Sequence, residues 1–175
     1  MRQLITAGQV LTGPAGSLIC DGAVLVDGAR IVAVGPAADV ARQAGPEVRR
    51  RDYPAHTLLP GLINCHVHLA LDAGPAPLDN LLAVNDDELL AGMAQRARQA
   101  LAAGVTTLRD LGDRRGLAMR LRDQITAGEV AGPRIVASGP PLTIPRDTAG
   151  SSAAWWTART TSAARSSTTR PWAPT

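Results

Sequence analysis

Lysine is absent from the 175 residues, whereas arginine and lysine together number 18. The formal net charge of +3 at pH 7 is concentrated at one end. Residues 146–175 contain four arginines and one acid, and residues 1–145 contain fourteen arginines and fourteen acids. A balanced charge over 1–145 argues against a basic face for nucleic acid. We therefore expect no nucleic-acid partner.

Cysteine and long apolar runs are also scarce. Cys20 and Cys65 are too few for a disulfide framework. No apolar run approaches the length needed to span a bilayer, and the N-terminus lacks the charged-then-apolar layout of a signal peptide. We expect a cytoplasmic protein with no membrane partner.

Histidine occurs three times, and two of the three lie in one apolar segment. Residues 62–69 are predicted to form a buried strand that carries His66 and His68, with Cys65 as a small buried side chain. Alternate residues of a strand point to one side, with about 6.6 Å between their Cα atoms. The two imidazoles are thus candidate ligands of one metal ion; two unrelated strand histidines are the alternative. His56 lies off this strand and is interpreted as a surface or packing residue.

The first third of the chain has the pattern of short strands. Residues 3–11 and 22–35 are rich in β-branched residues, and Asp27-Gly28 is a hairpin signal within the second of these segments. Residues 48–53 are predicted to form another strand. Such meandering strands fit part of a small β-sandwich.

A loop is predicted over residues 70–84, where glycine and prolines interrupt any period. Asp72 and Asp79 within it are either substrate contacts or solvated loop acids. Asn85 is then predicted to cap a helix, with Glu88 completing a capping box and Gly104 ending the helix.

Two further strands follow the first predicted helix. With the histidine strand counted as the first, residues 105–111 are predicted to form the second strand, with Asp110 near its end. This carboxylate is interpreted as a structural group that pairs with Arg109, Arg114 or Arg115; a site residue is the alternative. Asp113 is predicted to cap the next helix, and residues 134–138 form the third strand. Alternation of strands and helices with short links indicates parallel β/α units.

The string from Leu58 to Leu69, with Pro60-Gly61 before the histidine strand, resembles the first barrel strand of the amidohydrolase superfamily. The likeness is greatest to its imidazolonepropionase-like and Xaa-Pro dipeptidase-like members. Residues 103–110 and 132–140 agree with it, so the resemblance covers residues 1 to about 145. It implies an α/β fold, namely a truncated (β/α)8 TIM-like barrel of about three β/α units preceded by part of a small β-sandwich.

The resemblance also implies a metal-dependent hydrolase of carbon–nitrogen bonds in a cyclic amide or dipeptide-like small molecule. His66 and His68 then correspond to metal ligands for a divalent ion, zinc in the first instance, with one or two ions and a homo-oligomer in the intact enzyme. In the superfamily, later strands add a carboxylated lysine or a glutamate, two more histidines and an aspartate base. No lysine is present here and no histidine follows His68.

The length and the C-terminal composition indicate a partial enzyme. A (β/α)8 barrel takes roughly 250 residues. We predict a partial sandwich over 1–57, the first part of the barrel over 58–145, and a disordered segment over 146–175, where nineteen of thirty residues are Ser, Thr or Ala.

The segment 146–175 has a second interpretation. It contains all three tryptophans. If its codons are read one base earlier, those of Trp155-Trp156-Thr157 must encode Val-Asp. We therefore hypothesise a one-base deletion near codon 146; a genuine Ser/Thr-rich tail is the alternative. The chain is expected to be an inactive hydrolase fragment, and a non-catalytic interaction module is the competing function.

Overall fold

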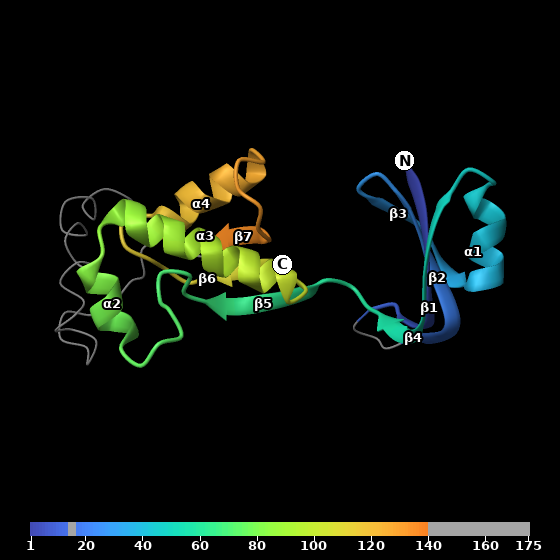
Figure 1. Ribbon diagram of the computed structural model, residues 1–175, viewed down its shortest axis with the longest axis horizontal. Coiled ribbons are helices and arrows are strands. Elements are labelled where there is room, and N and C mark those ends of the chain that lie inside the picture. Colours follow the sequence, from blue (N-terminus) through green and yellow to red (C-terminus); the bar gives the residue numbers. More distant parts are fainter. Residues whose placement is uncertain (14–16, 140–175) are drawn as a thin grey trace, which may run out of the picture. The chain divides into compact units, whose positions relative to one another are not determined.

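The computed structural model describes residues 1–13 and 17–139 (Figure 1). These residues form two compact units, the N-terminal unit Met1–Pro60 and the barrel unit that begins at Gly61. The segment 146–175, predicted to be disordered, lies outside the described residues. Among the described helices, none combines the length and the apolar character that a membrane span requires.

The N-terminal unit is a four-stranded sheet in the order β3-β2-β1-β4. The predicted hairpin is confirmed: Asp27 pairs with Arg30, and Gly28 has a φ of 59° between them. Glycine adopts this left-handed conformation without steric cost. The strands are β1 (Arg2–Leu11), β2 (Leu18–Asp27), β3 (Arg30–Pro36) and β4 (Arg49–Leu58).

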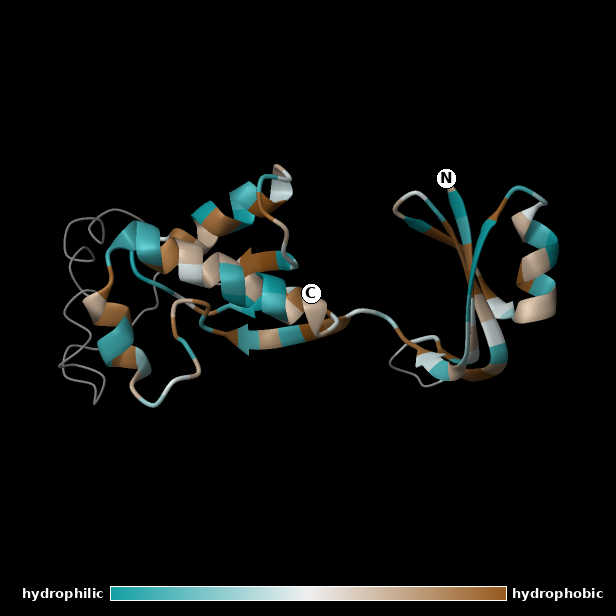
Figure 2. Ribbon diagram, viewed as in Figure 1, coloured by the Kyte–Doolittle hydropathy of each residue, from teal (hydrophilic) through white to brown (hydrophobic). Residues whose placement is uncertain are grey.

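The expected meander is wrong in its last step. A helix, α1 (Ala37–Ala44), follows β3, and β4 then returns to pair with β1 in parallel. A parallel pair requires a crossover connection, and α1 is part of it. Figure 2 shows that hydrophilic and hydrophobic residues are mixed along this helix, which buries Val40 and Ala44 on the sheet.

The barrel unit repeats strand and helix. Its three strands are parallel and lie in the order β5-β6-β7, which confirms the predicted β/α units. The elements are β5 (Leu62–Val67), α2 (Pro77–Ala83), α3 (Asp86–Ala102), β6 (Val105–Asp110), α4 (Leu117–Thr126) and β7 (Arg134–Ala137).

Local sequence signals explain where α3 begins and ends. Asn85 accepts hydrogen bonds from the backbone N–H groups of Asp87 and Glu88, and the Glu88 carboxylate accepts from the Asn85 N–H at 3.1 Å. The predicted capping box is therefore present. Gly104, with a φ of 90°, follows the helix as expected.

Two other helix predictions need correction. The predicted loop over 70–84 contains α2, which begins at Pro77; proline is favoured in the first turn, where its missing N–H costs no hydrogen bond. The N-cap of α4 is Gly116 rather than Asp113. The Asp113 carboxylate still accepts a hydrogen bond from the Ala118 N–H in the first turn.

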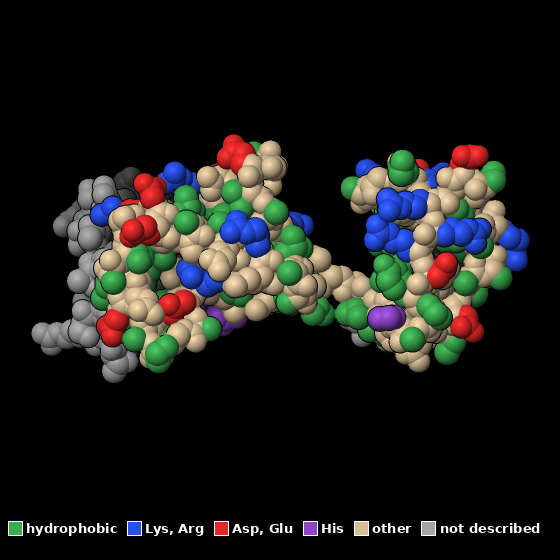
Figure 3. All heavy atoms as spheres, viewed as in Figure 1, with side chains coloured by type: hydrophobic (Ala, Val, Ile, Leu, Met, Phe, Trp, Pro, Cys, Tyr) green, Lys and Arg blue, Asp and Glu red, His purple; other side chains and the backbone are tan. Residues whose placement is uncertain are grey.

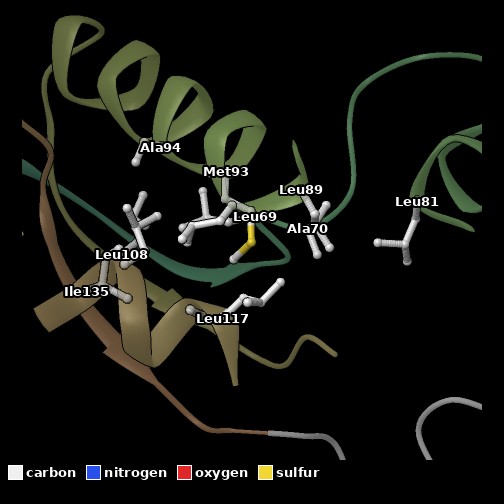
Figure 4. Packing of buried hydrophobic residues seen from close by; sticks show 13 residues of the cluster. Leu69, Ala70, Leu81, Leu89, Met93, Ala94, Leu108, Leu117 and Ile135 are labelled. Atoms are coloured by element: carbon white, nitrogen blue, oxygen red, sulfur yellow. The ribbon is translucent and has the colours of Figure 1, made fainter. Parts of the chain in front are cut away.

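The core of the barrel unit lies between its helices and its sheet. Figure 4 shows side chains from α3, α4, β6 and β7 converging there, and Met93 and Leu121 are fully buried. Helix α3 packs on β6 and α4 packs on β7.

The prediction that residues 62–69 form a buried strand is wrong in its burial. The strand ends at Val67, and Leu62, Ile63 and Cys65 are exposed, whereas Leu69 beyond the strand is buried. The reason is packing: α3 packs on β6 and α4 packs on β7, rather than on β5. An apolar sequence shows that a strand is suited to burial, but whether it is buried depends on the elements that pack on it.

Candidate metal centre

The structure brings the two predicted metal ligands together. His66 is the penultimate residue of β5, and His68 follows the end of the strand. Their ring centroids are 5.6 Å apart and the ring planes meet at 72°, so both rings lie on one side of the strand. Histidine side chains reach the surface of the barrel unit in Figure 3, and His66 is the more exposed of the pair. Metal binding by the two residues stays a prediction.

A hydrogen bond fixes the proton of the His68 ring. Its Nδ1 lies 3.0 Å from the carbonyl oxygen of Gly112, in the loop after β6. A carbonyl oxygen only accepts, so Nδ1 carries the proton and donates. The neutral ring then presents an unprotonated Nε2. Metal-binding histidines commonly make such a second bond through the nitrogen that does not coordinate.

Asp110 binds the backbone of the loop after β6, which contains Gly112. This carboxylate is fully buried and accepts hydrogen bonds from the backbone N–H of Leu69 at 2.8 Å and of Gly112 at 2.9 Å. Burial raises the pKa of Asp110, while the two backbone hydrogen bonds and the nearby His68 lower it. The interpretation of Asp110 as a structural group is thus supported, although its partners are backbone amides.

Two of the three expected arginine partners of Asp110 bind elsewhere. Arg114 and Arg115 form ion pairs with Asp86, at 2.9 and 2.8 Å respectively. Arg114 also donates to the carbonyl oxygens of Leu81 and Val84, at 3.0 and 2.6 Å. Arg114 therefore binds both the C-terminal end of α2 and the first residue of α3. Opposite charge alone could not predict that these arginines pair with Asp86 and not with Asp110.

Arg96 holds the chain directly after His68. Its Nε donates to the carbonyl oxygen of Leu69 at 2.6 Å, and burial lowers the pKa of the guanidinium while the charge of Asp72 raises it. Asp72 accepts from the Gly74 N–H at 3.0 Å and from the Asn80 amide at 2.8 Å, which gives it a structural role. Asp79 is exposed. Contact of either acid with substrate stays a prediction.

Asp113 is the second buried carboxylate of the barrel unit, with an exposed fraction of 1%. Burial, together with the negative charge of Asp110, raises the pKa of Asp113 to about 6; hydrogen bonds from the backbone N–H groups of Ala118 and Gly116 act in the opposite direction. Its Oδ1 atom has no hydrogen-bond partner among the described residues. The loop after β6 thus contains a group that changes charge just below neutral pH.

The donor set fits a metal ion but does not complete a catalytic site. His66 and His68 offer imidazole nitrogens, which suit zinc and other borderline divalent ions. No group of three metal-ligating side chains occurs within residues 1–13 and 17–139. Catalytic zinc takes three protein ligands. His56, on β4 of the N-terminal unit, packs edge-on against Tyr53 at 5.8 Å, in keeping with the predicted packing role.

Comparison with known proteins agrees with this geometry. The model of the amidohydrolase family matches residues 57–170, which is more than half of the chain. The chain belongs to the amidohydrolase family. A second model, described as an imidazolonepropionase-like composite domain of bacteria, matches residues 22–44 in the N-terminal unit.

Individual known proteins resemble the chain over about a third of their own length. An imidazolonepropionase of Paracoccus denitrificans is 30% identical, over 61% of this chain and 32% of the relative. A putative prolidase from Bifidobacterium longum shares 32% identity with a TM-score of 0.66, over 84% of this chain and 32% of that one.

A Xaa-Pro dipeptidase, crystallised with methionine in its active site, is similar at 29% identity and a TM-score of 0.65, over 79% of this chain and 33% of that one. These likenesses confirm the predicted fold class: the three parallel strands and the helices between them correspond to part of a TIM-like barrel.

Proposed function

We propose that the chain is part of a metal-dependent hydrolase that cleaves a carbon–nitrogen bond in a small cyclic amide or dipeptide-like substrate. Membership of the amidohydrolase family and the names of its relatives support a hydrolase of amide bonds. The observation that carries the metal assignment is the His66–His68 pair, with rings 5.6 Å apart at the carboxyl end of β5. Active sites of (β/α)8 barrels lie at this end of the strands.

The histidine pair and the residues that contact it would each have a specific role in this function. His66 and His68 would hold a divalent metal ion, zinc in the first instance, through imidazole nitrogens. The Gly112 carbonyl orients the His68 ring by accepting its Nδ1–H. A metal ion held there would supply Lewis acidity, which lowers the pKa of a bound water and polarises a substrate carbonyl. Arg96 holds the backbone immediately after the ligand pair.

We further propose that the 175-residue chain does not turn over substrate by itself. The described residues supply two ligands, and a catalytic zinc site needs a third together with a base within hydrogen-bond reach of its water. The competing function, a non-catalytic interaction module, predicts no metal binding at His66 and His68. Metal binding and turnover are therefore measured separately.

The first experiment titrates the metal-free chain with Co²⁺ and Zn²⁺ by calorimetry and visible absorption. We expect weak binding of one ion, lost in His66→Ala and in His68→Ala. His56→Ala is the matched control, because His56 lies in the N-terminal unit. Equal binding by all four proteins would contradict the assignment of the site.

The second experiment assays the same proteins against a panel of dipeptides and cyclic amides, with zinc or manganese added. We expect no turnover above background. Turnover that disappears in His66→Ala would contradict the proposed inactivity but support the hydrolase function.

A further inference from the structure

Two backbone peptides control where the His68 ring points. One is the peptide that joins His68 to Leu69. The other joins Gly112 to Asp113, and the Gly112 carbonyl oxygen, 44 residues away in the sequence, accepts the Nδ1–H of His68 at 3.0 Å. If either peptide shifts, the hydrogen bond that selects the ring tautomer is lengthened or lost.

A single carboxylate binds the His68–Leu69 peptide and the N–H of Gly112, the residue whose carbonyl faces His68. Oδ2 of Asp110 accepts from the Leu69 N–H at 2.8 Å, and Oδ1 accepts from the Gly112 N–H at 2.9 Å. The side chain is fully buried, and no side-chain donor binds it among the described residues. Its two oxygens thus connect the loop after β5 to the loop after β6. Buried hydrogen bonds to a charged acceptor are among the stronger ones in proteins.

We propose that Asp110 is a positioning residue for His68. By holding the Gly112 N–H, it fixes the backbone at Gly112 and thereby the position of the carbonyl that keeps the proton on Nδ1 and leaves Nε2 available to a metal ion. This inference rests on the proposed metal-binding function. The tautomer itself is a property of the metal-free protein and can be measured there.

The substitution Asp110→Asn tests the proposal with little change of shape. An aspartate side chain offers two acceptor oxygens, whereas asparagine offers one acceptor and one donor group. One of the two backbone N–H groups would then face an NH₂ group. The connection between the two loops is broken at Leu69 or at Gly112.

The experiment uses the full 175-residue chain, metal-free and labelled with ¹⁵N-histidine, at a pH where the rings are neutral. Long-range ¹H–¹⁵N correlation spectra report which ring nitrogen is protonated. We expect the Nδ1–H form of His68 in the wild type and a mixture of both forms in Asp110→Asn. Zinc affinity should fall about 10-fold or more, as for other groups that orient metal ligands.

Two controls separate positioning from general destabilisation. His66 has no ring hydrogen bond among the described residues, so its tautomer should be unchanged in the same spectra. Asp113→Asn alters the other buried carboxylate of the same loop, which binds the first turn of α4. It should leave the His68 tautomer as in the wild type.

Three results would overturn the proposal: an Nε2–H tautomer of His68 in the wild type, an unchanged tautomer and zinc affinity in a folded Asp110→Asn protein, or an equal change in Asp113→Asn. If Asp110→Asn does not fold, the wild type decides by its tautomer and by slow amide exchange of Leu69 and Gly112, which must both be observed. A tautomer change without zinc binding in any protein would refute the metal function and leave the positioning role intact.

Discussion

The two units bury different kinds of residue. Beneath α1, the N-terminal unit buries a cluster of five small or aliphatic side chains, whereas the barrel unit buries a cluster of thirteen. Asp110 and Asp113, the buried charged residues among those described, both belong to the barrel unit. Asp110 is the last residue of β6, and Asp113 lies in the loop that follows. A buried polar network needs rigid surroundings to keep its geometry, and the larger core lies in the unit that contains both carboxylates.

The largest expected effect tests whether the two cores are independent. Met93 in the barrel unit and Leu4 in the N-terminal unit are both fully buried. Met93→Ala and Leu4→Ala should each lower the free energy of unfolding by about 2–5 kcal/mol, because each leaves a cavity. Hydrogen exchange should show protection lost only in the unit that carries the substitution. Equal loss in both units after either change would mean that they unfold as one.

The buried carboxylate Asp113 should make the barrel unit less stable as pH rises. Its folded pKa of about 6 exceeds the ordinary value of 3.8, so the folded state binds the proton more tightly than the unfolded state. Stability therefore falls between about pH 4 and pH 6 as the proton is lost, by roughly 3 kcal/mol at most.

The measurement compares urea unfolding of the wild type and Asp113→Asn across this range. Relative to the wild type, Asp113→Asn should lose up to about 3 kcal/mol of stability on acidification from pH 7 to pH 4. A difference that does not vary with pH would show that this carboxylate titrates normally.

A close backbone contact should make one glycine of the N-terminal unit sensitive to a single methyl group. A Cβ atom at Gly8 would collide with the carbonyl oxygen of Pro54 on β4, where the pairing of β1 and β4 is irregular. At Gly35 it would meet only Val40, at an ordinary 3.6 Å. Gly8→Ala should cost about 1–3 kcal/mol in thermal or urea unfolding, and Gly35→Ala distinctly less. Similar costs at both positions would argue against the close approach.

The smallest expected effect concerns the helix starts. Helix α3 has a capping box at Asn85, whereas α1 begins after Pro36 with no side-chain cap. Asn85→Ala should lower the stability of the barrel unit by about 1 kcal/mol. The exposed mid-helix change Gln95→Ala is the control and should be nearly neutral, as followed by circular dichroism during thermal unfolding. A neutral Asn85→Ala would show that tertiary packing alone fixes the start of α3.

Local signals predicted the parts of the fold that depend on neighbours in sequence. The Asp27-Gly28 hairpin and the Asn85–Glu88 capping box both involve residues within a few positions of each other. Helix α2 was missed although Pro77 is a recognised start signal, because the glycine and prolines nearby indicated a loop. Helix α1 was missed because its eight residues begin without a side-chain cap.

The sequence by itself determined the histidine pair, because the spacing of two residues on a strand places both rings on one side. Only the tertiary structure decided what surrounds the pair. His68 meets the Gly112 carbonyl across 44 residues, and Asp110 meets the Leu69 amide across 41. These contacts depend on the parallel pairing of β5 with β6, which brings their carboxyl ends together. Every residue has a backbone carbonyl, so the sequence does not show which carbonyl orients the His68 ring. The alignment of the strands decides this.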